Sequence, residues 1–172
     1  MKRIIYVITI SIAIMFMTTL NILAAPHNPN DYTSVNEVSD LLPPNVKQSK
    51  VTETPKTRGD FFSGADLIIK NNGNGNVGVL ARGYTRHPVD EAYITVYLDK
   101  WDETAERWRQ IKYFEQEFYA KDYPEGLVTP TIDITFTNQE RGYYYRLRGV
   151  FAVVYNGEVE AFSPTTDGVL LD

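Results

Sequence analysis

The sequence predicts an all-β domain, built as a two-sheet antiparallel sandwich of about seven strands. Three observations support this fold. Apolar and polar residues alternate in several short runs, turn-forming residues separate these runs about every ten residues, and no segment of about twelve or more residues has a helical period. Because each such strand has one apolar face, two sheets must pack together to bury these faces.

The strongest local signal is a β-hairpin around Asn156-Gly157. Asn-Gly favours a type I′ turn, since both central residues of that turn need a positive φ. The preceding arm has one alternating face with Tyr143, Tyr145, Leu147, Gly149, Phe151 and Val153. Arg146 and Arg148 lie on the opposite face, where we expect them to point outward and pair with Glu158 and Glu160 of the returning arm.

The other expected strands are residues 61–70, 77–84, 93–101, 107–119 and 127–137, with a last short strand at 168–171. The Asn/Gly cluster at 71–76 predicts that the first two pair antiparallel. Tyr143 or Tyr145, near the start of the penultimate strand, is placed to form a tyrosine corner. We therefore expect an immunoglobulin- or fibronectin type III-like topology, with a jelly roll or another sandwich as the alternative.

The N-terminal residues predict export. Residues 1–24 combine a positive start, a long apolar run and small residues before a cut after Ala24, the order of a signal peptide. The alternative is an uncleaved membrane anchor, since the run is long enough to span a bilayer. Residues 25–58 hold five prolines and few large apolar side chains, which predicts a flexible linker before the sandwich domain at 59–172.

Composition limits the partners and the location. The chain has no cysteine, so it forms no disulfide. Loss of Lys2 and Arg3 with the signal peptide leaves 15 of the 17 basic side chains against 22 acidic ones, a net charge of −7. This charge argues against nucleic acid as a partner, and against a membrane except through an uncleaved N-terminal segment. We expect a secreted or cell-surface protein.

Five stretches of the sequence resemble one family: RGDFFSGADLII, GYTRHPVDEAYITVYLDKW, ERW, GYYYRLRGV and NGEVEAFSPTTDGV. This is a family of small exported proteins of Gram-positive bacteria with a β-rich domain of unknown function. The resemblance covers about Arg58 to Val169, and its most specific part is GYYYRLRG followed by the Asn-Gly hairpin. It implies export and a small β-rich domain, and it brings no activity and no functional residues.

No catalytic constellation is evident, so we expect no enzyme activity and no cofactor. The chain has two histidines, no cysteine and no Gly-x-Ser-x-Gly motif. Glu115 and Glu117 share one strand face about 7 Å apart, which leaves a carboxylate-dependent hydrolase as an alternative. Asp99, Asp102 and Glu103 form a weak candidate for Ca²⁺, without the full spacing of a calcium loop.

Aromatic residues are the best candidates for ligand binding. Tyr93, Tyr97 and Trp101 share the strand face opposite the apolar Ile94, Val96 and Leu98, so we expect them to face outward. With Trp108 they form a candidate surface, because exposed rings pack on sugars, peptides or proteins. The alternative is that Trp101 and Trp108 pack on each other as cross-strand partners.

The sequence therefore predicts a secreted or cell-surface, non-catalytic binding module for an extracellular protein or glycan. One alternative is a small secreted hydrolase. Another is a structural subunit that assembles by pairing edge strands.

Overall fold

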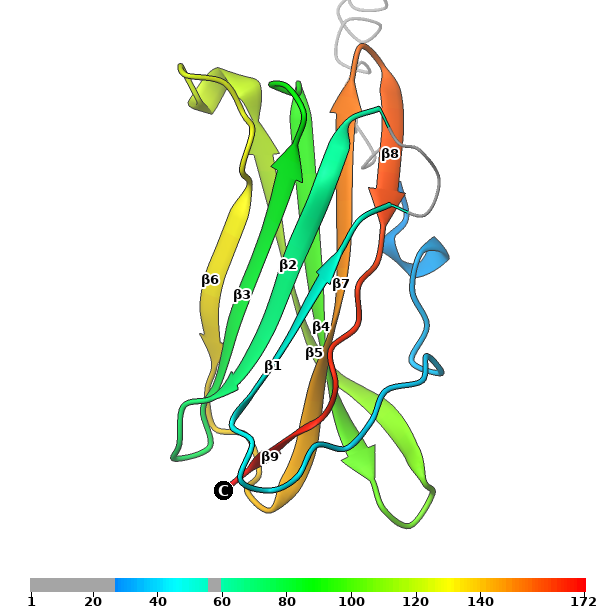
Figure 1. Ribbon diagram of the computed structural model, residues 1–172, viewed down its shortest axis with the longest axis vertical. Coiled ribbons are helices and arrows are strands. Elements are labelled where there is room, and N and C mark those ends of the chain that lie inside the picture. The colour runs from blue at the N-terminus through cyan, green and yellow to red at the C-terminus, as the bar shows by residue number, and fades with distance from the viewer. Residues whose placement is uncertain (1–26, 56–59) are drawn as a thin grey trace, which may run out of the picture.

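The computed structural model describes residues 27–55 and 60–172 as two antiparallel β-sheets packed face to face (Figure 1). The first sheet has the order β1 (Gln48–Glu53), β2 (Phe62–Asn71), β3 (Val77–Thr85) and β6 (Thr131–Phe136). The second has the order β5 (Arg107–Tyr119), β4 (Glu91–Asp102), β7 (Tyr143–Tyr155) and β8 (Glu158–Phe162). A short β9 (Val169–Leu171) pairs with the start of β7. The predicted all-β sandwich is confirmed.

Two short 3₁₀ turns, η1 (Pro29–Asp31) and η2 (Ala120–Asp122), are the only helical elements among the described residues. No helix within this part of the chain is long and apolar enough to cross a membrane. The predicted signal peptide, residues 1–24, lies outside the described residues.

The strand order is that of an immunoglobulin-like sandwich. In their order within the sheets, β2, β3 and β6 take the places of strands A, B and E, and β5, β4, β7 and β8 take those of C′, C, F and G. Near the start of β7, the Tyr145 hydroxyl donates a hydrogen bond of 2.7 Å to the backbone carbonyl of Glu140. This is the tyrosine corner, so Tyr145 rather than Tyr143 has that role. The expected immunoglobulin- or fibronectin type III-like topology is confirmed.

The apolar faces predicted from alternation form the core between the two sheets. Buried residues from four central strands include Leu67, Ile69, Val79, Ile94, Val96, Leu98, Leu147, Phe151 and Val153. The turn after β7 is also as predicted, since Asn156 and Gly157 have φ of 52° and 79°, both positive as a type I′ turn requires.

A β-bulge in β5 changes which of its residues share a face. The pairing with β4 shifts between Leu98 and Asp99, where Leu98 pairs with Lys112 and Asp99 with Gln110. Ile111 is therefore an extra residue in β5. Simple alternation would put Trp108 and Phe118 on one face. Because of the bulge, the two side chains lie on opposite faces: Phe118 packs in the core, and Trp108 lies on the outer face of the sheet.

The expected flexible linker does not hold for the described residues 27–55. Gln48–Glu53 forms the edge strand β1 and pairs with β2 in antiparallel register, from Gln48 opposite Lys70 to Glu53 opposite Ala65. This strand was missed because QSKVTE contains a single large apolar residue, Val51, which packs against the core. Its stability comes from pairing with β2, which local sequence does not reveal.

Candidate functional site

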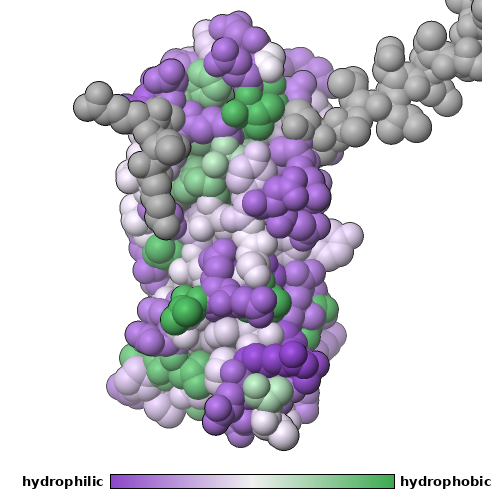
Figure 2. All heavy atoms as spheres, turned by 90° about the vertical axis from the view of Figure 1, so that its right-hand side faces the viewer, coloured by the Kyte–Doolittle hydropathy of each residue, from purple (hydrophilic) through white to green (hydrophobic). Residues whose placement is uncertain are grey.

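Residues 27–42, here called the strap, lie across the outer face of the second sheet. The strap is the blue segment on the right of Figure 1, and Figure 2 looks onto that side. The His27 ring lies 5.1 Å from the Tyr93 ring, and the Tyr97 hydroxyl donates to Asn30 Oδ1 at 3.2 Å. At the other end, the amide of Leu42 donates to the carbonyl of Gly168 at 2.9 Å. The strap thus begins over β4 and ends beside the segment that precedes β9.

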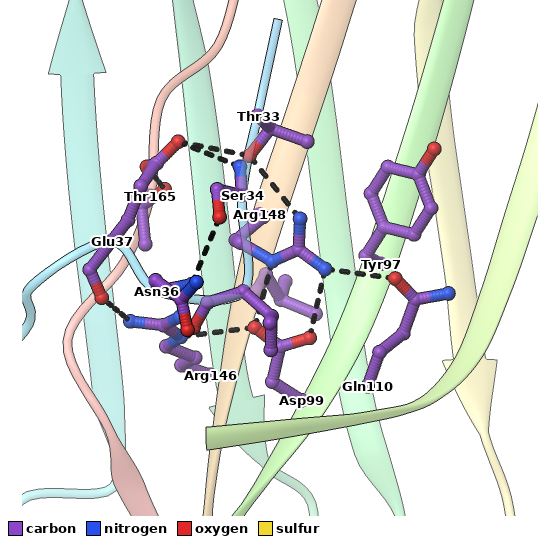
Figure 3. A network of polar contacts seen from close by, with 12 residues as sticks. Thr33, Ser34, Asn36, Glu37, Tyr97, Asp99, Gln110, Arg146, Arg148 and Thr165 are labelled. Carbon is purple, nitrogen blue, oxygen red and sulfur yellow. Dashed lines mark hydrogen bonds and ion pairs between the residues drawn. The ribbon is translucent and has the colours of Figure 1, made fainter. Parts of the chain in front are cut away.

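Under the strap lies a buried ion triad of Asp99, Arg146 and Arg148 (Figure 3). Asp99 Oδ2 accepts from Arg146 Nε at 3.0 Å and from Arg148 Nε at 2.8 Å, and Asp99 Oδ1 accepts from Arg148 Nη2 at 3.1 Å. Burial lowers the pKa of Arg146, and the Asp99 carboxylate opposes this effect. Asp99 and Arg146 are cross-strand partners in β4 and β7.

The expected pairing of the two arginines with Glu158 and Glu160 is wrong. Glu160 instead accepts hydrogen bonds from the backbone amides of Phe61 and Phe62, at 2.8 and 3.2 Å. The arginines do lie on the predicted non-core face of β7, but the strap covers that face. Side chains with polar ends can occupy such a position because Asp99 supplies the opposite charge there.

The arginines also hold the strap in place. Arg146 donates to the backbone carbonyls of Glu37 at 2.6 Å and Val35 at 2.8 Å, and to Ser39 Oγ at 2.9 Å. The guanidinium groups stack over aromatic rings as well: Arg146 lies 4.6 Å from the Trp108 ring centroid and Arg148 lies 4.7 Å from that of Tyr97. Strap, ion triad and outer-face rings therefore form one packed layer.

This layer buries most of the predicted ligand-binding surface. Tyr93, Tyr97 and Trp108 are 4%, 5% and 6% exposed, so the expectation that Tyr93 and Tyr97 face water is wrong. Of the four predicted residues, Trp101 alone is partly exposed. The cross-strand alternative is confirmed for the tryptophans, whose rings pack edge to face with centroids 5.3 Å apart.

Two hollows remain open between the strap and β5. The tyrosine hollow, of about 290 Å³, is lined by Pro29, Asn30, Tyr97, Gln110, Tyr113 and Glu115. The tryptophan hollow, of about 320 Å³, is lined by Val35, Asn36, Glu37, Val38, Ser39, Trp101, Glu106, Arg107 and Trp108. Tyr97 and Trp101 lie four residues apart on β4, which places the two hollows about 13 Å apart along the strand. Each has an aromatic wall on one side and the strap on the other.

A wider hollow, of about 630 Å³, lies beside Tyr32, Phe162 and Thr165 and is bounded by Glu53 and Pro55. Pro55 borders residues 56–59, which lie outside the described ranges, so we place no site there. The lining of this hollow contains none of the residues predicted to bind a ligand.

The three acidic residues predicted as a weak Ca²⁺ candidate, Asp99, Asp102 and Glu103, do not form a cluster. Asp99 is enclosed by two arginines, whereas Asp102 lies at the end of the β4–β5 hairpin. The backbone amide of Ala105 and then the Arg109 guanidinium lower the pKa of Asp102 by hydrogen bonding to its carboxylate. Among residues 27–55 and 60–172 no cluster of three potential metal ligands is present. Asp102 therefore stabilises the β4–β5 hairpin, and Asp99 belongs to the ion triad.

Glu115 and Glu117 share the outer face of β5, opposite Thr95 and Tyr93 in register. Glu117 accepts a hydrogen bond from the Tyr119 hydroxyl, while Glu115 lines the tyrosine hollow. The structure therefore brings one of the two carboxylates, rather than the pair, to a hollow.

Sequence reasoning missed Asn30, Gln110 and Tyr113 as members of the tyrosine hollow. Asn30 lies in the segment taken as linker. Gln110 reaches the outer face near Tyr97 through the bulge at Ile111. Tyr113 pairs directly with Tyr97 and is 64% exposed, but its position beside Tyr97 depends on the pairing of β4 with β5, which the sequence does not reveal.

No known protein family and no curated protein matches this sequence. The resemblance to small exported proteins of Gram-positive bacteria therefore stays a prediction.

Proposed function

We propose that this chain is a secreted or cell-surface, non-catalytic binding module whose ligand, an extracellular protein or glycan, occupies the tyrosine and tryptophan hollows. The observation that supports this best is that both hollows are lined by the strap together with β4 and β5, each with aromatic rings beside hydrogen-bonding groups. Rings in such positions contribute large contact areas at low entropic cost, and the polar groups set orientation.

The rigidity of the surroundings supports a binding role. Both hollows have β4 and β5 on one side, and the strap on the other is tied to β7 through Arg146. A site on such fixed elements loses little conformational freedom when a ligand binds. The proposed location outside the cell rests on the predicted signal peptide and on the resemblance to exported proteins.

The test is a binding assay with purified Ala25–Asp172 and its Tyr113→Ala and Trp101→Ala variants. The probes are a panel of cell-wall and host polysaccharides and a cell-surface protein fraction. Each substitution should weaken binding by about tenfold or more, as loss of an aromatic anchor does. Tyr123→Ala, which removes another exposed tyrosine away from both hollows, is the matched control and should bind normally. Unchanged binding by folded Tyr113→Ala and Trp101→Ala would exclude both hollows.

A second candidate is a structural subunit that assembles through β5. This strand lies at the edge of its sheet, spans Arg107–Tyr119 and exposes Ile111 and Tyr113. Unpaired edges can add a strand from another chain. However, the bulge at Ile111 and the charged Lys112, Glu115 and Glu117 are features that disfavour edge pairing. Sedimentation analysis decides this: concentration-dependent self-association that Ile111→Lys abolishes would favour assembly.

A further inference from the structure

We infer that the ligand of the two hollows is an extended, neutral glycan that places one sugar ring against Tyr113 and another against Trp101. This inference rests on the proposed binding function and names the chemical class of its ligand. The size, the spacing, the hydrogen-bonding groups and the charge of the hollows support it.

The size of each hollow fits a single ring. Volumes of about 290 and 320 Å³ lie just below and just above the lower limit of the range of about 300–1,000 Å³ for small-molecule sites. Because the hollows are about 13 Å apart along β4, no single ring reaches both. A ligand that engages both must therefore be a chain of several rings in an extended form.

The polar groups of the tyrosine hollow suit hydroxyl groups. Gln110 Oε1 already accepts a hydrogen bond from Arg148 Nη2 at 2.9 Å, which leaves the amide NH₂ group as the free donor. Glu115 has no hydrogen-bond partner among the described residues and is a free acceptor. A sugar hydroxyl both donates and accepts, so neighbouring hydroxyls can bond Gln110 and Glu115 together. The exposed ring of Tyr113 then lies beside them for stacking.

Charge favours a neutral glycan over an acidic one. Glu115 lines the tyrosine hollow. Glu37 and Glu106 line the tryptophan hollow, which also has one basic residue, Arg107. The whole chain has a net charge of −5. These carboxylates would repel a uronic acid or a phosphate.

Among the described residues, the side of the molecule that faces the viewer in Figure 2 carries no single large hydrophobic patch of the kind that marks many protein interfaces. On the side that Figure 2 shows, hydrophobic residues are scattered among hydrophilic ones rather than gathered into one patch. The fully buried centres of protein interfaces are more apolar than this.

The test is a titration of Ala25–Asp172 with two neutral series, β-linked glucose and β-linked N-acetylglucosamine oligomers, from the monosaccharide to the hexasaccharide. Calorimetry gives affinity, and tryptophan emission reports on Trp101. Affinity should rise at least about tenfold with length, because the longer oligomers engage the second hollow as part of the same molecule. Tyr113→Ala and Trp101→Ala should each remove this dependence on length, and Tyr123→Ala should keep it.

Three outcomes would overturn the inference: affinity independent of chain length, tighter binding of an acidic polysaccharide, or no binding of either series. If neither series binds but the wild-type chain retains a surface protein that Tyr113→Ala and Trp101→Ala lose, the glycan is wrong and the binding function stands. If wild type and variants behave alike toward both glycans and proteins, the binding function at these hollows is wrong as well.

Discussion

At the scale of single residues, Asp99 is the most constrained side chain of the outer layer. Its carboxylate is fully buried and ion-paired with two arginines, and one of these, Arg146, also binds the backbone of the strap. Removing one partner of a buried ion pair leaves an uncompensated charge, which costs far more than loss of a surface pair. The stability of the layer therefore depends on this one carboxylate.

We predict that Asp99→Asn lowers the free energy of unfolding by about 3–5 kcal/mol, because two buried guanidinium groups then lack a counter-charge. Urea denaturation measures this change. Asp102→Asn is the matched control, since Asp102 pairs with the half-exposed Arg109 at the hairpin end. Its effect should be much smaller, and equal losses in the two variants would contradict the central place of the triad.

At the scale of elements, the strap is a segment with almost no regular structure that nonetheless has a fixed position. Apart from η1 it has no helix and no strand, and it is held by contacts with Tyr93, Tyr97, Arg146 and Gly168. Its first contact is the His27 ring, whose two nitrogens are buried without a hydrogen-bond partner among the described residues. A ring in this setting is best accommodated in its neutral form.

We predict that the start of the strap loosens in mild acid. Burial lowers the pKa of His27 below its ordinary value of 6.5, so the unfolded or undocked state binds the proton more tightly. The docking free energy is therefore complete above about pH 6.5 and falls as the pH drops below that value toward the lowered pKa. Hydrogen exchange of strap amides between about pH 7 and pH 5 measures the effect.

The control for this pH response compares variants of the two histidines of the chain, His27 and His87. His27→Phe keeps an aromatic ring against Tyr93 and should abolish the response, whereas His87→Asn should leave it intact. The same acid loosening in His27→Phe would show that another group is responsible.

At the scale of the whole molecule, the protein is a two-sheet sandwich with a partial third layer on one side. The inner faces of the sheets bury the core, and the strap buries a second set of rings on the outer face. This arrangement explains how a strand face rich in tyrosine and tryptophan exists without a large exposed aromatic surface. It also makes the strap one wall of both candidate hollows.

We predict that a chain beginning at Leu42 unfolds with a free energy lower by about 3 kcal/mol or more. The truncation uncovers Tyr93, Tyr97 and Trp108, and loss of burial costs about 1.5 kcal/mol or more for a large side chain. Tryptophan emission should shift to the red as Trp108 meets water. Addition of a peptide of residues 27–41 should reverse the shift, and an unchanged unfolding free energy would show that the strap contributes nothing to the fold.

The sequence left the tyrosine corner open between Tyr143 and Tyr145, but it predicted the sandwich, the Asn156-Gly157 hairpin and the core faces. Each of these follows from local alternation or from a turn that needs a positive φ. The tertiary structure alone decided the outer layer. The contact of Arg146 with Val35 joins residues 111 apart, and β1 and the strap are short polar segments without a period of their own. Their positions depend on distant partners, and the open hollows depend on those positions.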